Sequence, residues 1–345
     1  MPAKVDTYLD LARETALGLA GSVGAWTAFL DTASRLYKYP FADQLMIHAQ
    51  RPEATACASY EVWNDTMRRY VRRGAKGIAL VDNSGDTPRL RYVFDIADTG
   101  TRRSSRPFSP WEINDGNLAE VQLGLKQDFG TNGEWLSSQL QDVARDLAEM
   151  YFDAHRHDIA GIIDGSLMAG YDEGELRDSF TKAAYASTAY ALLSRCGYDP
   201  AAYFDESDFA FLGEWDAPEA ATALGTAVSE NTQMVLRQIE RTVRREERSR
   251  AHGTELYDEG RSIAARAEPA RDGANRPLRE DAPEVFAGAP AFPVEPAPDE
   301  RDAVAAPARD RSGGAEPHRP DLQPREQARV LGRQLVLPPL LARNT

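Results

Sequence analysis

Cysteine is scarce in this sequence, with only Cys57 and Cys196 among its 345 residues. Two cysteines so far apart exclude a disulfide framework and any zinc site built from several thiolates. This usage is typical of a reducing compartment, and we expect a cytoplasmic protein. Cys57 has no histidine or other base beside it in the sequence, so we interpret it as a small buried residue and not as a nucleophile.

Sequence motifs of catalysis and metal binding are also missing. There is no His-Glu-x-x-His, no Walker A loop and no Gly-x-Gly-x-x-Gly. His155 and His157 are two positions apart, so on a helix they would point to different faces and could not chelate one metal ion. The sequence therefore offers no positive case for an enzyme, a metal ion or a cofactor.

Long apolar stretches are lacking as well. No part of the sequence approaches the roughly 18 consecutive apolar residues that a membrane-spanning helix needs. The first six residues show no apolar core of a secretory signal peptide. We expect no membrane partner.

Positive charge is in deficit over the whole chain, because 40 Lys and Arg face 54 Asp and Glu, for a net charge of −14. That balance argues against a simple nucleic-acid coat protein. The deficit is uneven, however: residues 131–215 hold 5 basic against 16 acidic residues, net −11, whereas residues 35–106 hold 13 against 8, net +5. The whole-chain charge therefore says little about the N-terminal region.

The pattern of apolar residues predicts an α+β protein, in which N-terminal helices and a small antiparallel β-sheet precede an all-helical region and a disordered tail. Helical spacing is found over residues 5–20, 23–37, 42–50, 134–160, 173–196 and 218–250. Residues 77–82 and 89–96 are rich in strand-forming residues, and the segment between them is dense in turn formers. That arrangement is typical of a β-hairpin.

Proline marks the end of the foldable region. Thirteen of the 21 prolines lie in residues 263–345, where Phe286 and Phe292 are the only aromatic residues. Such a segment cannot bury enough apolar surface to offset its ordering entropy, which predicts a disordered tail over residues 261–345. The remaining chain divides by composition into a domain over residues 1–130 and an acidic helical region over residues 131–260.

The densest basic segment runs from Arg68 to Lys76 and carries five basic residues in nine positions with no acidic one. Cations at this density suit phosphate contacts. Tyr70 lies among them and Trp63 shortly before them, and aromatic faces can stack on bases. The alternative is a solvated basic turn before a strand, with Trp63 and Tyr70 in the core, and local composition by itself favours that alternative.

The acidic block also has two interpretations. Asp142, Asp146, Glu149 and Asp153 recur at three to four positions, so they would form one face of a helix. This face is either a solvated surface or a DNA-like surface that occupies a protein partner through residues 131–250. The spacing is compatible with both.

Four blocks, in order, resemble one known family. They are Phe41-Ala-Asp-Gln-Leu-Met-Ile-His-Ala-Gln50, Tyr60-Glu-Val-Trp-Asn64, Val71-Arg-Arg-Gly-Ala-Lys-Gly-Ile78 and Val93-Phe-Asp-Ile-Ala-Asp-Thr99. The first, third and fourth resemble the patterns N-Q-L-L-I-x-x-Q, V-R-K-G-E-K-G-I and V-F-D-I-S-Q-T of the single-stranded-DNA-binding N-terminal domain of the ArdC antirestriction family. The same domain is found at the N-terminus of LtrC-like proteins of conjugative elements, which residues 1–250 also resemble.

The resemblance implies a sequence-tolerant single-stranded-DNA-binding protein of a mobile element, with antirestriction as a further expectation. Its motifs imply phosphate contacts by Arg72, Arg73 and Lys76. Charge or motif position adds the other candidate contacts, Arg68, Arg69, Lys38, Trp63, Tyr70 and Gln44.

The sequence departs from the family pattern in three ways. Ala75 stands where an acidic residue is usual, Asp43 stands where Asn is common, and no His-Glu-x-x-His of a peptidase-like domain follows. Two alternatives therefore stay open. One is an acidic protein-interaction or DNA-mimic module, and the other is the N-terminal part of a larger methylase- or helicase-like protein.

Overall fold

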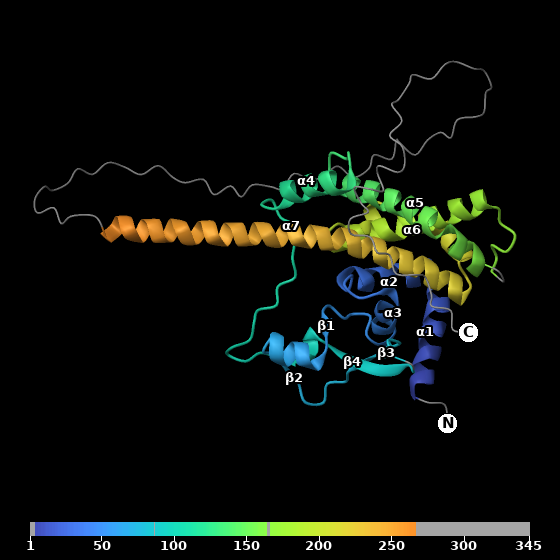
Figure 1. Cartoon of the computed structure of the whole chain (residues 1–345), viewed down its shortest axis with the longest axis horizontal. Helices are drawn as coiled ribbons and strands as arrows, with labels where there is room; N and C mark the ends of the chain where they lie inside the picture. Colours follow the sequence, from blue (N-terminus) through green and yellow to red (C-terminus); the bar gives the residue numbers. More distant parts are fainter. Residues whose placement is uncertain (1–3, 86, 164–165, 267–345) are drawn as a thin grey trace, which may run out of the picture. The chain divides into compact units, whose positions relative to one another are not determined.

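The structure is a computed structural model that describes residues 4–85, 87–163 and 166–266, with backbone alone over residues 251–266. It confirms the predicted α+β class (Figure 1). Apart from the last turn of a helix that ends at Arg266, the predicted disordered tail lies outside the described residues.

The N-terminal region begins with three helices, α1 (Lys4–Ala20), α2 (Val23–Arg35) and α3 (Phe41–Gln50). All three were predicted from apolar spacing. Ser22 caps α2, because its hydroxyl accepts a hydrogen bond from the backbone N–H of Ala25. Pro40 precedes α3 in an extended conformation and so fixes where that helix starts.

The predicted hairpin consists of β3 (Ile78–Asp82) and β4 (Arg89–Asp95), which pair antiparallel with Ile78 opposite Val93. The short strand β1 (Cys57–Ala58) pairs with the other edge of β4. A second pair joins β2 (Tyr70–Val71) to β5 (Thr99–Gly100). A two-residue strand is too short to show an alternating pattern, so β1, β2 and β5 were not predicted.

The apolar face of the hairpin is covered by α1 and α3. Ile78, Leu80 and Val93 point into a core with Met46 and Ile47 of α3. At the edge of the sheet, the Gln50 side-chain amide donates to the Ala79 carbonyl (2.8 Å) and accepts from the Ala79 N–H (3.0 Å). The sheet is thus fixed to α3 by both packing and hydrogen bonds.

In the helical region, two helices have their predicted length and two differ from the prediction. Its helices are α4 (Leu118–Phe129), α5 (Leu136–Ile162), α6 (Glu173–Arg195) and α7 (Pro218–Arg266), with 3-10 turns η3 (Pro200–Ala202) and η4 (Glu206–Glu214) before α7. The helix α4 was not predicted, and α7 continues beyond residue 250. The next proline after Pro218 is Pro269, so no proline interrupts α7.

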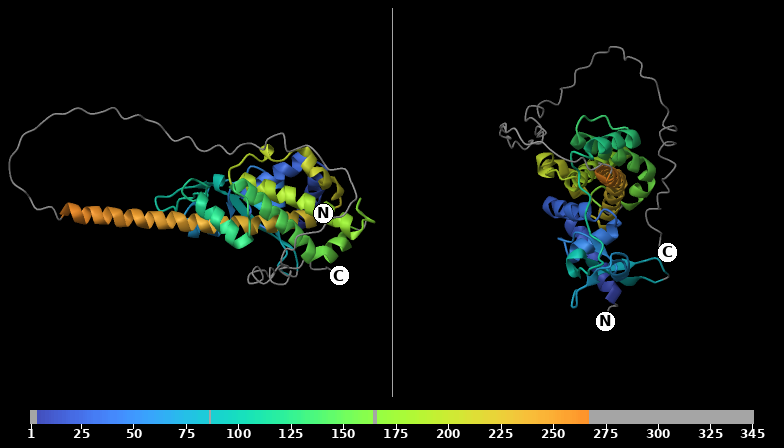
Figure 2. Two further views of the ribbon diagram at one scale, coloured as in Figure 1. Left: turned by 90° about the horizontal axis from the view of Figure 1, so that it is seen from above. Right: turned by 90° about the vertical axis from the view of Figure 1, so that its left-hand side faces the viewer.

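The N-terminal helices pack directly on the helical region, with α2 against α6 and with α1 and α3 against α7 (Figure 2). The buried Trp26 indole donates a 2.8 Å hydrogen bond to Ser187 on α6. Where α3 crosses α7, Gly225 faces the ring of Phe41. The predicted division at residue 130 therefore runs through one packed unit.

A buried hydroxyl joins four segments of this unit. The Tyr37 hydroxyl, just after α2, donates to Glu240 on α7 (2.8 Å) and accepts from the Trp111 indole (3.0 Å). Arg195, at the end of α6, lies with its guanidinium 3.6 Å from the Trp111 ring centroid. Burial raises the pKa of Tyr37 well above its ordinary value. The phenol therefore stays protonated, and we call these four residues the Tyr37 junction.

None of the helices in the described ranges is both long enough and apolar enough to cross a membrane.

Gly225→Ala should destabilise the protein, although alanine ordinarily stabilises a helix interior. An added methyl group would lie 2.1 Å from the Phe41 ring, which is buried and cannot move away. We expect a loss of about 1–3 kcal/mol from overpacking, measured by urea denaturation. Gly18→Ala in α1 is the control, because its methyl group meets open space and should add about 0.5–1 kcal/mol. Equal effects of the two substitutions would contradict the close crossing.

Tyr37→Phe should lower the free energy of unfolding by about 1–3 kcal/mol, because it leaves the buried Trp111 N–H and one oxygen of Glu240 without their partner. The ring and its packing are retained. Tyr60→Phe serves as the matched control, since Tyr60 is 53% exposed. Urea denaturation of both variants measures the difference, and a Tyr37→Phe variant as stable as the control would show that the junction contributes nothing.

Candidate functional site

The predicted basic segment folds into a tight turn at Arg72–Ala75. The Ala75 N–H donates to the Arg72 carbonyl (3.1 Å), and Gly74 adopts φ +85° at the third position. Arg73 does not have positive φ, so this is a type II turn. Glycine is favoured at that position because a side chain strains left-handed backbone. The turn places Arg73 at its tip, where the side chain is exposed.

Two arginines of this segment are anchored on the strand pair beneath it. The Arg69 Nε donates to the Thr99 hydroxyl (2.8 Å), and Arg72 Nη1 donates to the Ala97 carbonyl (3.1 Å). Arg73 and Lys76 are exposed, and within the described part of the chain neither side chain has a hydrogen bond or an ion pair. The turn therefore presents two uncompensated cations on a backbone fixed by its neighbours.

A second basic segment, residues 101–106, lies beside the first. The Ser105 hydroxyl donates to the Arg68 carbonyl (2.7 Å), and the Arg106 N–H donates to the Met67 carbonyl (2.9 Å). These bonds hold Arg68 at φ +53°, a left-handed conformation that is uncommon for arginine. Together the two segments form what we call the basic surface: Arg68, Arg69, Arg72, Arg73, Lys76, Arg102, Arg103 and Arg106.

The nearest carboxylates of the sheet are engaged elsewhere. Asp98 forms an ion pair with Arg51. Asp95 is buried and accepts hydrogen bonds from the backbone N–H groups of Thr55 (2.9 Å) and Ala97 (3.0 Å). Neither carboxylate forms an ion pair with the cations of the basic surface, which consequently keeps most of its charge.

Tyr70 borders the basic surface with part of its ring exposed, and Tyr60, whose ring packs against Phe94, precedes it in the chain. Tyr70 is 41% exposed and lies across Gly100, its partner in the strand pair, with the Arg102 guanidinium 5.7 Å from its ring centroid. Tyr60 is 53% exposed and starts the segment that leads into the turn. Their exposed ring surfaces are available for stacking.

Trp63 belongs to the core. Only 2% of the residue is exposed, and its indole donates to the Phe94 carbonyl (2.8 Å). It lies in a short π-helical turn, η1 (Val62–Thr66), which directly precedes the basic segment. The sequence left open whether the Trp63 ring stacks on a base or supports the core. Its burial shows that it supports the core.

Gln44 and Lys38 lie apart from the basic surface. Gln44 is buried in α3 and donates to the carbonyls of Leu36 (3.2 Å) and Tyr39 (2.9 Å), so it holds the turn between α2 and α3. Lys38 forms an ion pair with Glu240 of α7 (2.6 Å). Asp43, where the family pattern has Asn, is buried and paired with Arg91.

Sequence reasoning missed three members of the basic surface, namely Arg102, Arg103 and Arg106. Their signal was present as the run Thr101-Arg-Arg-Ser-Ser-Arg106, which contributes to the net charge of +5 over residues 35–106 but was not named among the candidate contacts. The hydrogen bonds that join this run to residues 67 and 68 have no signature in the sequence. Only the tertiary structure brings the two segments together.

Three other features raised by the sequence are Cys57, the acidic face of α5 and metal binding. Burial raises the pKa of the Cys57 thiol to about 12, far from the thiolate form that a nucleophile needs. Arg177 of α6 pairs with Glu149 and Asp153 of α5, which neutralises part of the acidic face. Among the described residues, no group of three or more His, Cys, Asp or Glu side chains could hold a metal ion.

Comparisons with known proteins leave the family open. No family model, curated protein or solved structure matches the chain. The resemblance to the ArdC N-terminal domain therefore stays a prediction, and the basic surface has to be interpreted from its own geometry.

Gly74→Ala should destabilise the protein by about 1–2 kcal/mol, because a side chain is disfavoured in left-handed backbone. The cost is conformational, since an added methyl group would meet no atom within 4 Å. Gly85→Ala is the matched control, because Gly85 is an exposed loop glycine without positive φ. Urea denaturation measures both, and equal stability of the two variants would contradict the type II turn.

Proposed function

We propose that this protein binds single-stranded DNA, without strong sequence preference, through the basic surface. The observation that carries the proposal is the cluster of arginines and Lys76 from two chain segments, held in place by backbone hydrogen bonds. Arg73 and Lys76, which have no partner among the described residues, are central to it. Cations fixed in this way contact phosphates with little loss of backbone entropy.

The exposed tyrosines favour a single strand over a duplex. Stacking on an aromatic ring needs an unpaired base, and each such stack contributes about 1–3 kcal/mol whatever the base. Tyr70 offers a partly exposed ring next to the Arg102 guanidinium, and Tyr60 offers a second exposed ring earlier in the same part of the chain. A strand whose phosphates lie on the arginines could therefore place bases on these rings.

The resemblance to ArdC N-terminal domains points the same way. Its four blocks fall in α3, in η1, in the basic turn with the start of β3, and in β4 with β5, which are neighbours in this fold. On this proposal the protein coats incoming single-stranded DNA of a conjugative element in the cytoplasm. Protection of that DNA from restriction is the biological role that follows.

The test is a salt titration of binding to a fluorescently labelled thymidine oligonucleotide of about 20 nucleotides, followed by anisotropy. Binding should weaken steeply with salt, because each phosphate contact contributes about −0.7 to the slope of log K against log salt concentration for single strands. Arg73→Gln with Lys76→Gln should weaken binding roughly tenfold at low salt and reduce that slope by about 1.4.

The control variant carries Arg13→Gln and Arg156→Gln, which removes the same charge elsewhere. Arg156 is exposed without a partner in the described residues, and Arg13 forms only a long surface ion pair (3.7 Å) with Glu219. This control variant should bind the oligonucleotide like the unmodified protein. The proposal would be overturned by no binding at low salt, by equal losses in the two variants, or by a duplex that competes as well as a single strand.

A further inference from the structure

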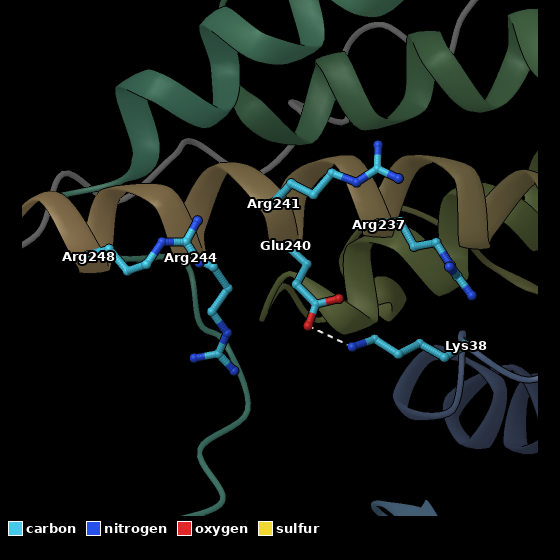
Figure 3. A pocket seen from close by; sticks show the side chains of 6 residues that line it. All are labelled: Lys38, Arg237, Glu240, Arg241, Arg244 and Arg248. Atoms are coloured by element: carbon cyan, nitrogen blue, oxygen red, sulfur yellow. Dashed lines mark hydrogen bonds and ion pairs between the residues drawn. The ribbon is translucent and has the colours of Figure 1, made fainter. Parts of the chain in front are cut away.

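A second concentration of cations lies on α7, outside the basic surface. A cavity of about 340 Å³ is lined by Lys38, Arg237, Glu240, Arg241, Arg244 and Arg248 (Figure 3). Five of these six side chains carry positive charge. We call this feature the arginine pocket, and none of its arginines was among the candidate contacts predicted from the sequence.

The single carboxylate of the pocket is already compensated. Glu240 accepts hydrogen bonds from Lys38 (2.6 Å) and Tyr37 (2.8 Å). Burial acts to raise the pKa of Glu240, but these two donors outweigh it and the pKa lies below its ordinary value. Glu240 therefore stays ionised and holds Lys38 in place. Because it is the single carboxylate of the lining and is already paired, the pocket has no second carboxylate to neutralise its four arginines.

Three of the four arginines are available to a ligand. Arg237, Arg241 and Arg248 are exposed and have no hydrogen bond or ion pair within the described residues. Arg244 is fixed instead, because it donates to the Ser109 carbonyl (2.5 Å) and pairs with Glu247 (2.9 Å). Figure 3 shows Arg237 and Arg244 pointing to the same side of α7 as Glu240 and Lys38.

The spacing of the arginines makes a linear array. Positions 237, 241, 244 and 248 are separated by four, three and four residues. At about 100° per residue they fall within about 60° of the helix circumference, and at 1.5 Å per residue they extend over about 16 Å of the helix. A single phosphate or carboxylate would contact one end of this array, whereas a linear polyanion can follow its length, although Figure 3 shows the Arg241 side chain pointing away from Glu240 and Lys38.

We propose that the arginine pocket binds the phosphate backbone of a single-stranded DNA. Guanidinium groups suit phosphates because they donate two parallel hydrogen bonds to two oxygens. Tyr37, which contacts Glu240 of the pocket, and Trp111 are 3% and 2% exposed and are bound to each other, so neither ring can stack on a base. None of the six lining residues is aromatic, so the pocket itself contacts the backbone and does not read sequence.

The identity of the polyanion rests on the proposed function, but the pocket itself does not. The pocket is formed by α7 and by Lys38, between α2 and α3, whereas the basic surface is formed by residues 68–76 and 101–106. Each can therefore be removed without altering the other.

The test compares three full-length variants by anisotropy with the labelled thymidine oligonucleotide. Arg237→Gln with Arg248→Gln should weaken binding roughly tenfold at low salt and lower the salt slope by about 1.4. Arg73→Gln with Lys76→Gln reports on the basic surface, and Arg13→Gln with Arg156→Gln is the charge-matched control. Circular dichroism melting curves check that all three remain folded.

The outcomes separate the two proposals. If only the basic-surface variant weakens binding, the pocket inference is overturned and the proposed function stands. If only the pocket variant weakens it, the pocket is supported and the role of the basic surface fails. If both behave like the control, both proposals are overturned.

Two competitors identify what the pocket recognises. Inorganic polyphosphate, which has no bases, should displace the oligonucleotide from the unmodified protein and should do so less well from the pocket variant. Polyglutamate should compete weakly, because isolated carboxylates lack the spacing and charge density of a phosphate chain. Failure of polyphosphate to compete would overturn backbone recognition, and equal competition by polyglutamate would indicate an acidic protein as the ligand.

Discussion

The Tyr37 hydroxyl is the contact on which the arrangement of the other elements depends. It accepts from Trp111, in the segment that leaves the sheet, and donates to Glu240 of α7. Trp111 in turn lies against Arg195 of α6. One buried phenol thus ties the end of α2, the segment after the sheet and two helices together. Because Glu240 also holds Lys38, the same group sets the position of the arginine pocket relative to the N-terminal helices.

The long elements could be predicted because each carries its own signal. Helices α1, α5 and α6 show apolar residues at intervals of three and four, and the β3–β4 hairpin shows strand formers on both sides of a turn. The strand pair β2–β5 has no such signal, since two residues define each strand and the partner lies 30 positions away (Tyr70 opposite Gly100). Pairing at that separation is a property of the tertiary structure and has no local pattern.

Only part of the candidate site could be predicted, for a similar reason. Charge density identified the segment from Arg68 to Lys76, because a run of like charges is visible in the sequence, and the family resemblance implied phosphate contacts by Arg72, Arg73 and Lys76. Residue type could not separate Tyr70, which is partly exposed, from Trp63, which is buried under a hydrogen bond to Phe94. Nor could it show that Lys38 faces α7. Burial and partnership depend on what folds over a residue, and they divide the candidates into two separate surfaces.

The pairing of Gln50 with Ala79 also determines how the sheet meets other molecules. An unpaired strand edge is a template on which a strand of another chain can add, which is a common route to aggregation. At β3 the Gln50 amide occupies both backbone groups of Ala79, as a neighbouring strand would. A carboxylate at this position could still accept from the Ala79 N–H but could not donate to its carbonyl. Deamidation of this one side chain would therefore leave the Ala79 carbonyl without its donor and free to accept a hydrogen bond from a strand of another chain.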